Sequence, residues 1–141
     1  MLKGIPPVLS PELLKILCEM GHGDEIVIGD GNFPACSINN RVVRADSISA
    51  CVLLDAILKV IPLDTYSDSN LFLMEVVPGD NTPTPIWDDY KRIADANDPN
   101  VSIGHIERFA FYERAKKAYA VIASGETAIY GNIIIKKGVI K

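Results

Sequence analysis

Apolar positions recur three and four residues apart in several stretches of this chain, a spacing typical of amphipathic helices. The clearest stretch covers residues 10–21. Ser10 is placed to cap the free N–H groups of this helix, Pro11 suits its first turn, and Gly21 is placed to end it. Further helices are expected at residues 47–60, with Ser47 as the cap, at 85–97, starting on Pro85, and at 111–118.

Short apolar runs bounded by turn-forming residues separate these helices, and they predict strands. The expected extended segments are residues 25–28, 42–43, 71–77, 101–106, 119–123 and 132–135. Because helical and extended segments alternate, we predict an α/β fold with a central sheet flanked by helices. The length suits one compact domain over residues 1–141.

Composition narrows the class of protein. The chain is 48% apolar, enough for a real core, and its net charge of -4 with no basic tract argues against nucleic acid as a partner. No apolar run approaches the ~20 residues of a membrane span, and no secretory signal is seen. Three unpaired cysteines suit a reducing cytoplasm, with Cys18 and Cys51 expected in the core.

Two residues near the first strand are candidates for chemistry. His22 lies in the loop before residues 25–28 and Asp30 follows them, between two glycines. The imidazole could transfer protons, and the carboxylate could orient that ring or hold a hydroxyl group. The alternative is a purely structural role for both. His22 would hydrogen-bond nearby backbone at the end of the first helix, and Asp30 would hydrogen-bond its own backbone in an Asx-turn. A metal held by His22, Asp24 and Asp30 lacks a further well-spaced ligand.

Polar and aromatic residues later in the chain suit a sugar. Arg108 offers planar donors to hydroxyl groups, and Tyr112 offers a ring and a hydroxyl. Tyr130 and Asn132 flank Gly131 just before the last strand. A salt-bridged surface strip and a plain turn are the alternatives for these two segments. Neither a G-x-S-x-G elbow nor a glycine-rich phosphate loop is present, so a serine nucleophile and nucleotide chemistry have no support.

Taken together, the motifs above and several short blocks between them resemble the fucose branch of the fucose mutarotase/ribose pyranase family. The resemblance runs from Leu2 to Val139, and many blocks match in the same order. The blocks that carry it are Met20 to Val27, Asp30 with Asn32-Phe33-Pro34, Arg44-Ala45-Asp46, Leu63 to Tyr66, Ile106 to Lys117, Gly125-Glu126 and Tyr130-Gly131-Asn132. The glycines on both sides of Asp30 depart from the bulkier neighbours usual in relatives.

The resemblance implies a ribose pyranase-like α/β fold and a cofactor-free isomerase that interconverts the anomers of L-fucose. It also implies homo-oligomers with sites near subunit contacts, decameric rings and smaller assemblies both occurring in the family. His22 matches the catalytic proton donor. The matched sugar-binding positions are Asp30, Arg108, Tyr130 and Asn132. Asp64 and Tyr112, which match positions implicated mainly in animal-like members, are expected to bind the sugar as well.

Three alternatives remain open on the sequence. The sugar could be another monosaccharide such as D-ribose. The chain could bind a sugar without catalysing any step, or it could be a structural oligomer whose aromatic strip, which includes Phe109 and Phe111, only builds interfaces.

Overall fold

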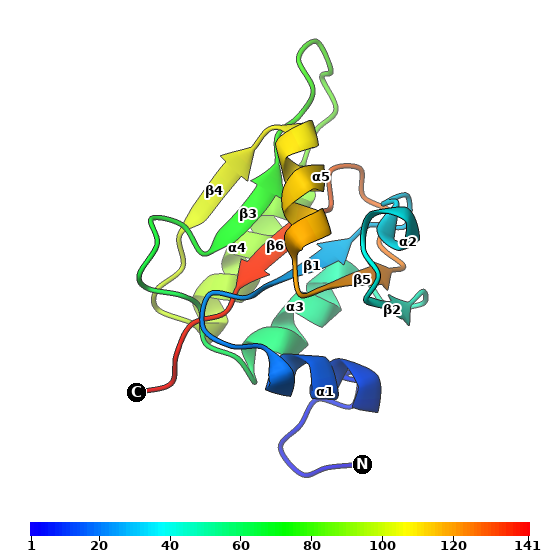
Figure 1. The fold of residues 1–141 in the computed structure, drawn as a ribbon. Helices are drawn as coiled ribbons and strands as arrows, with labels where there is room; N and C mark the ends of the chain where they lie inside the picture. The colour runs from blue at the N-terminus through cyan, green and yellow to red at the C-terminus, as the bar shows by residue number, and fades with distance from the viewer.

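Six strands form one mixed sheet at the centre of the molecule, in the order β2-β5-β1-β6-β3-β4 (Figure 1). The computed structural model describes all residues, 1–141. The strands are β1 (Glu25–Gly29), β2 (Val42–Ala45), β3 (Leu71–Met74), β4 (Ile103–Ile106), β5 (Ala120–Ser124) and β6 (Ile133–Lys136). Only β6 runs antiparallel to its neighbours β1 and β3, and the other pairs are parallel.

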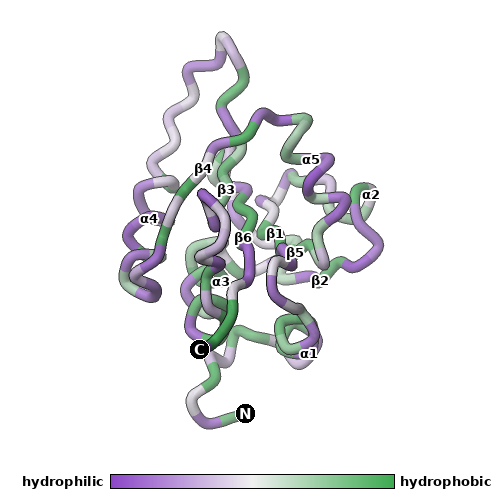
Figure 2. The backbone as a smooth tube through the Cα atoms, turned by 60° about the vertical axis from the view of Figure 1, so that its left-hand side comes forward, coloured by the Kyte–Doolittle hydropathy of each residue, from purple (hydrophilic) through white to green (hydrophobic).

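Five helices cover the two faces of this sheet. They are α1 (Pro11–Glu19), α2 (Ala35–Ile38), α3 (Ala50–Leu58), α4 (Pro85–Asn97) and α5 (Arg108–Lys117). The larger core lies between α1, α3, α4 and one sheet face, and the smaller one lies under α2 and α5 on the other face. Figure 2 shows the apolar colour concentrated over the central strands and polar positions along α4. The predicted α/β class is confirmed.

The central strands explain why the sheet is covered on both faces. Strands β1, β5 and β6 are apolar in nearly every position rather than in alternate ones, and almost all of their residues are buried. Neighbouring residues Ile26 and Val27 therefore enter opposite cores. Such continuous apolar strands are stable only when helices cover both sides.

Several predicted boundaries differ from the structure. Ser49, not Ser47, caps α3 by accepting a hydrogen bond from the backbone N–H of Val52. The strand predicted to end at Val77 ends at Met74, because the chain then leaves the sheet toward Pro78 and Gly79. The helix predicted from Phe111 begins at Arg108, since the Glu107 side chain caps two backbone N–H groups there.

The expectation for one cysteine was wrong. Cys18 is exposed, because the buried residues of α1 are Leu13, Ile16 and Leu17 and position 18 points away from that face. Cys51 is half-buried. In addition, no helix has both the length and the apolar character needed to cross a bilayer.

Candidate functional site

Four loops meet at the carboxyl ends of the parallel strands, and they bring together most of the predicted sugar-binding residues. Asp30 follows β1, Arg108 and Tyr112 lie on α5 after β4, and Tyr130 and Asn132 precede antiparallel β6. All five line one open hollow of about 150 Å³. The hollow is completed by Asn32, Phe33, Met74, Val77 and Ile129. This edge of an open α/β sheet is where ligands usually bind.

Asp30 forms the floor of this hollow and is only 7% exposed. Its carboxylate accepts a hydrogen bond from the Asn32 N–H at 2.9 Å, and its own N–H donates to the Asn132 amide oxygen at 2.8 Å. Burial raises the pKa of Asp30, although these hydrogen bonds oppose the rise. The Asx-turn considered from the sequence is therefore present, and the same carboxylate also faces the hollow.

Tyr130 is held in an unusual backbone conformation beside Asp30. Its φ of 61° is positive, which is uncommon for a residue with a side chain. Three hydrogen bonds hold Tyr130. Its carbonyl accepts from the Trp87 indole N–H at 3.0 Å. Its hydroxyl donates to the Asp80 carboxylate at 2.6 Å and also accepts from the Val77 N–H. The hydrogen bond to Asp80 raises the pKa of Tyr130. Its hydroxyl is thus already occupied.

Arg108 and Tyr112 form the opposite wall and lie one turn apart on α5. The Arg108 guanidinium is exposed, and its Nε lies 3.4 Å from the Tyr112 hydroxyl. The Tyr112 ring packs edge-on against Phe33 and Phe109. Phe111 is fully buried, whereas Phe109 is 66% exposed. The two therefore play different parts, one in the core and one on the surface beside the hollow.

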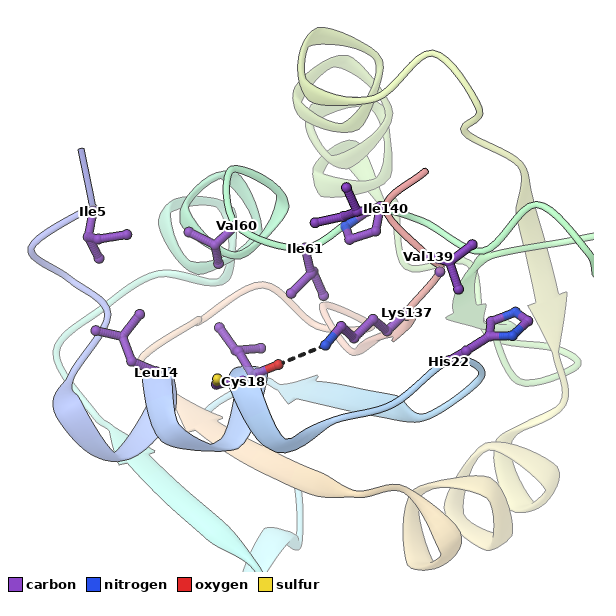
Figure 3. A pocket seen from close by; sticks show the side chains of 12 residues that line it. Ile5, Leu14, Cys18, His22, Val60, Ile61, Lys137, Val139 and Ile140 are labelled. Atoms are coloured by element: carbon purple, nitrogen blue, oxygen red, sulfur yellow. Dashed lines mark hydrogen bonds between the residues drawn. The ribbon is translucent and has the colours of Figure 1, made fainter.

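His22 and Asp64 lie at the other edge of the sheet. His22 is in the loop before β1, and Asp64 is in the loop before β3. The His22 Nε2 lies 3.0 Å from an Asp64 oxygen. The His22 side chain is 44% exposed, whereas that of Asp64 is 1% exposed. Figure 3 shows His22 at the end of an apolar groove of about 510 Å³, beyond Val139 and Lys137.

Asp30 therefore does not orient His22 within one chain, as the sequence suggested it could. The five residues of β1 separate the two, and at ~3.3 Å per residue they span about 17 Å. Asp64 lies beside His22 instead, because the chain after α3 pairs with the end of β6 at Leu63 and Lys137. The same separation prevents His22 and Asp30 from sharing a metal ion, and Asp24 bonds the Gly21 N–H.

Two residues of this second edge were missed from the sequence. Lys136 lies 3.7 Å from Asp64, and it donates a hydrogen bond to Ser67 at 2.6 Å. Each is an ordinary surface residue type in the sequence. Only the tertiary structure, which places Lys136 at the end of β6 beside a buried carboxylate, gives it a role.

Known proteins are similar to this chain over its full length. The model of the RbsD / FucU transport protein family matches residues 3–140. The chain is 53% identical to "Fucose mutarotase" from Danio rerio, covering 99% of this chain and 94% of that protein. Matching structures include FucU from Bifidobacterium longum (57% identity, TM-score 0.96) and the fucose mutarotase in complex with L-fucose from Streptococcus pneumoniae (49%, TM-score 0.93).

Each of those two alignments covers 99% of this chain and 100% of the other. The structure of Bacillus subtilis RbsD complexed with D-ribose is 21% identical with a TM-score of 0.73 over the whole of both chains, which shows the same fold. The family model and relatives with about half of their residues identical span nearly the entire sequence. The chain therefore belongs to the RbsD / FucU transport protein family.

Proposed function

We propose that this protein is a sugar mutarotase that interconverts the α and β anomers of L-fucose. The observation that carries the proposal is the hollow itself: a buried carboxylate, an amide, a guanidinium and two tyrosines face one open space. Hydroxyl-rich ligands need such a mixture of acceptors, donors and rings. The names of the relatives that share half of this sequence supply the sugar.

The reaction transfers protons and opens and recloses one C–O bond without any change of oxidation state, so it needs neither an oxidant nor a phosphate donor. The anomeric hydroxyl loses a proton to a base while the ring oxygen gains one from an acid, and the C1–O bond to the ring oxygen breaks. The resulting aldehyde rotates, and the ring closes on the other face of the carbonyl as the two protons return. In this scheme, His22 is the acid and reclaims its proton on ring closure.

The role of each side chain in sugar binding follows from the hydrogen-bonding capacity that it has left within the chain. Asp30 has acceptor capacity beyond its bond to Asn32, and Arg108 is exposed with donors to spare. The Tyr112 hydroxyl has only the 3.4 Å contact to Arg108, whereas that of Tyr130 is bonded to Asp80. We therefore assign Tyr112, with a bound water as the alternative, to the anomeric proton, and Tyr130 to covering the sugar.

The complete site then requires two copies of the chain. A sugar in the Asp30 hollow is out of reach of the same chain's His22, so a second copy must present its own His22 there. Apolar residues are exposed beside both halves: Tyr66, Val139 and Ile140 near His22, and Phe109 and Ile129 near the hollow. Exposed apolar residues of this kind mark association surfaces. We infer a homo-oligomer that works in the cytoplasm, where its three unpaired cysteines stay reduced.

Exchange NMR of the anomeric protons tests this function. We expect the protein to accelerate exchange between the L-fucose anomers more than exchange between the D-ribose anomers. We expect His22→Ala to lose most of that acceleration while keeping the wild-type circular dichroism spectrum. Positioned acid–base catalysis contributes roughly 10²–10⁴-fold. Binding of L-fucose with no change in exchange rate would instead identify a non-catalytic sugar-binding module. No binding and no acceleration would leave only a structural oligomer.

A further inference from the structure

The loop that carries His22 is fixed to the end of β6 together with the loop that carries Asp64. The N–H of Gly23 donates to the Lys137 carbonyl, and the N–H of Lys137 donates to Asp24. On the other side, the N–H of Asp64 donates to the Lys136 carbonyl at 3.0 Å. Backbone hydrogen bonds thus hold His22 and Asp64 in register across this strand end, before any side chain is considered.

Asp64 is a buried carboxylate with one cation behind it. Its Oδ1 faces His22 Nε2 at 3.0 Å and accepts from the Tyr66 N–H at 3.2 Å. Its Oδ2 has no hydrogen-bond partner, and the nearest charge is Lys136 Nζ at 3.7 Å. Burial works to raise the pKa of Asp64, but Ser67, His22, the Tyr66 N–H and Lys136 together hold it well below its usual range. A buried carboxylate persists only with such compensation.

An ionised carboxylate has no hydrogen to give, so the hydrogen between the two residues must belong to the imidazole. The nitrogen that faces Asp64 is Nε2, and therefore Nε2 carries the hydrogen in the neutral ring. Nδ1 then holds the lone pair. No other group of the same chain hydrogen-bonds the His22 side chain, so Nδ1 is not tied to another part of the chain.

Resting on the mutarotase function above, we propose that Asp64, Lys136 and Ser67 are positioning residues that fix His22 as its Nε2–H tautomer. When His22 is protonated on both nitrogens, Nδ1 is then the atom that gives its proton to the sugar ring oxygen, and it takes that proton back as the ring closes. Asp64 is 1% exposed and acts through His22 rather than by touching the sugar. This assignment revises the sugar-binding role expected for Asp64 from the family resemblance.

Other groups around His22 leave this arrangement intact. The Tyr66 ring packs beside the imidazole, with ring centroids 5.0 Å apart. The Lys141 Nζ lies 5.5 Å from the centroid of the Tyr66 ring, on Tyr66 rather than on His22. Asp24 bonds the Gly21 N–H. Lys137, which lines the same groove, donates to the Leu17 and Met20 carbonyls at the end of α1. Figure 3 shows its side chain reaching toward this helix. None of these groups competes for a ring nitrogen of His22.

Two-bond ¹H–¹⁵N correlation spectra of histidine-labelled protein test the tautomer directly. The chain has only two histidines, so His105 serves as the internal reference and His22→Ala assigns the spectrum. We expect the neutral His22 ring to carry its hydrogen on Nε2. In Asp64→Asn this preference should be lost, and kcat should fall roughly tenfold to a hundredfold with KM little changed, as for other residues that orient a reacting ligand.

Lys136→Met keeps the Asp64 carboxylate and removes only the cation beside it. It therefore tests whether these residues orient His22 even if Asp64→Asn fails to fold. It should lower kcat in the same direction, whereas the matched control Lys137→Met should leave both the tautomer and kcat as in the wild type. A neutral wild-type ring with its hydrogen on Nδ1 overturns the proposal, as does an unchanged tautomer and kcat in Asp64→Asn. If the wild type shows the Nε2–H tautomer yet no anomer exchange, the mutarotase function fails while the orienting role stands.

Discussion

Mixing two inactive variants tests whether each site is built from two copies of the chain. His22→Ala removes the proposed proton donor at one end of the sheet, and Asp30→Asn alters the hollow proposed to bind the sugar at the other. About 17 Å of β1 lies between the two positions, far more than a hydrogen bond of about 3 Å can bridge. Each variant therefore keeps one half of the site intact.

The activity expected of the mixture follows from the fraction of sites in which both the histidine and the hollow are intact. In co-expressed oligomers with equal amounts of both variants, a site is intact when its histidine comes from an Asp30→Asn copy and its hollow from a His22→Ala copy. Random assembly gives that combination in about one site of four, whatever the number of subunits around a closed symmetric assembly. The mixture should thus recover about a quarter of wild-type exchange, against less than about a tenth for each variant alone.

Exchange NMR of L-fucose anomers on the unselected co-expressed mixture provides the measurement, and a tandem affinity pull-down with differently tagged chains shows that mixed oligomers form. Co-expressed Asp30→Asn and Arg108→Ala form the matched control, because both lie in the same half and every hollow stays damaged. This control should recover nothing. If the co-expressed His22→Ala/Asp30→Asn mixture shows only the mean of the two variants, the two-copy site is wrong and each chain must close its own site.

Four further predictions address sugar binding, stability and pH. Asp30→Asn should weaken fucose binding roughly tenfold to a hundredfold, the loss of a charge-assisted hydrogen bond of about 1.5–3 kcal/mol. Because burial raises the folded-state pKa of Asp30, stability is lost as pH rises through that value, so Asp30→Asn should be no less stable at neutral pH in urea unfolding. Gly125→Ala would place its Cβ 2.1 Å from the Asp46 carbonyl oxygen and should cost about 1–3 kcal/mol, whereas the control Gly21→Ala, with its nearest atom 3.7 Å away, should change stability by less than about 0.5 kcal/mol. The lowered pKa of Asp64 contributes stability above the unfolded-state pKa of about 3.9 that is lost as pH falls toward the folded-state value, so Asp64→Asn should flatten the acid limb of the stability profile measured by circular dichroism, and a steep unchanged limb would contradict this.

Local signals in the sequence located most elements because the physics that forms them is local. Ser10 and Pro11 start α1, and Pro85 starts α4, as predicted, since capping and a fixed proline φ act within one turn. The same reasoning misplaced the cap of α3 by two residues, because Ser47 and Ser49 both offer a hydroxyl. Only packing of the helix against the sheet decides which one faces the free N–H groups.

The sequence by itself determined the class of fold, the apolar segments that build the sheet and, through its resemblance to a family, the side chains available for chemistry. The tertiary structure decided how they combine. Strand order brings Asn132 and Arg108 to Asp30 at one edge, and the run of β1 carries His22 to the opposite edge, beside Asp64 and Lys136. Strand pairing joins residues more than a hundred positions apart, such as Glu25 and Lys136, and no spacing along the chain encodes which end of the sheet each of them reaches.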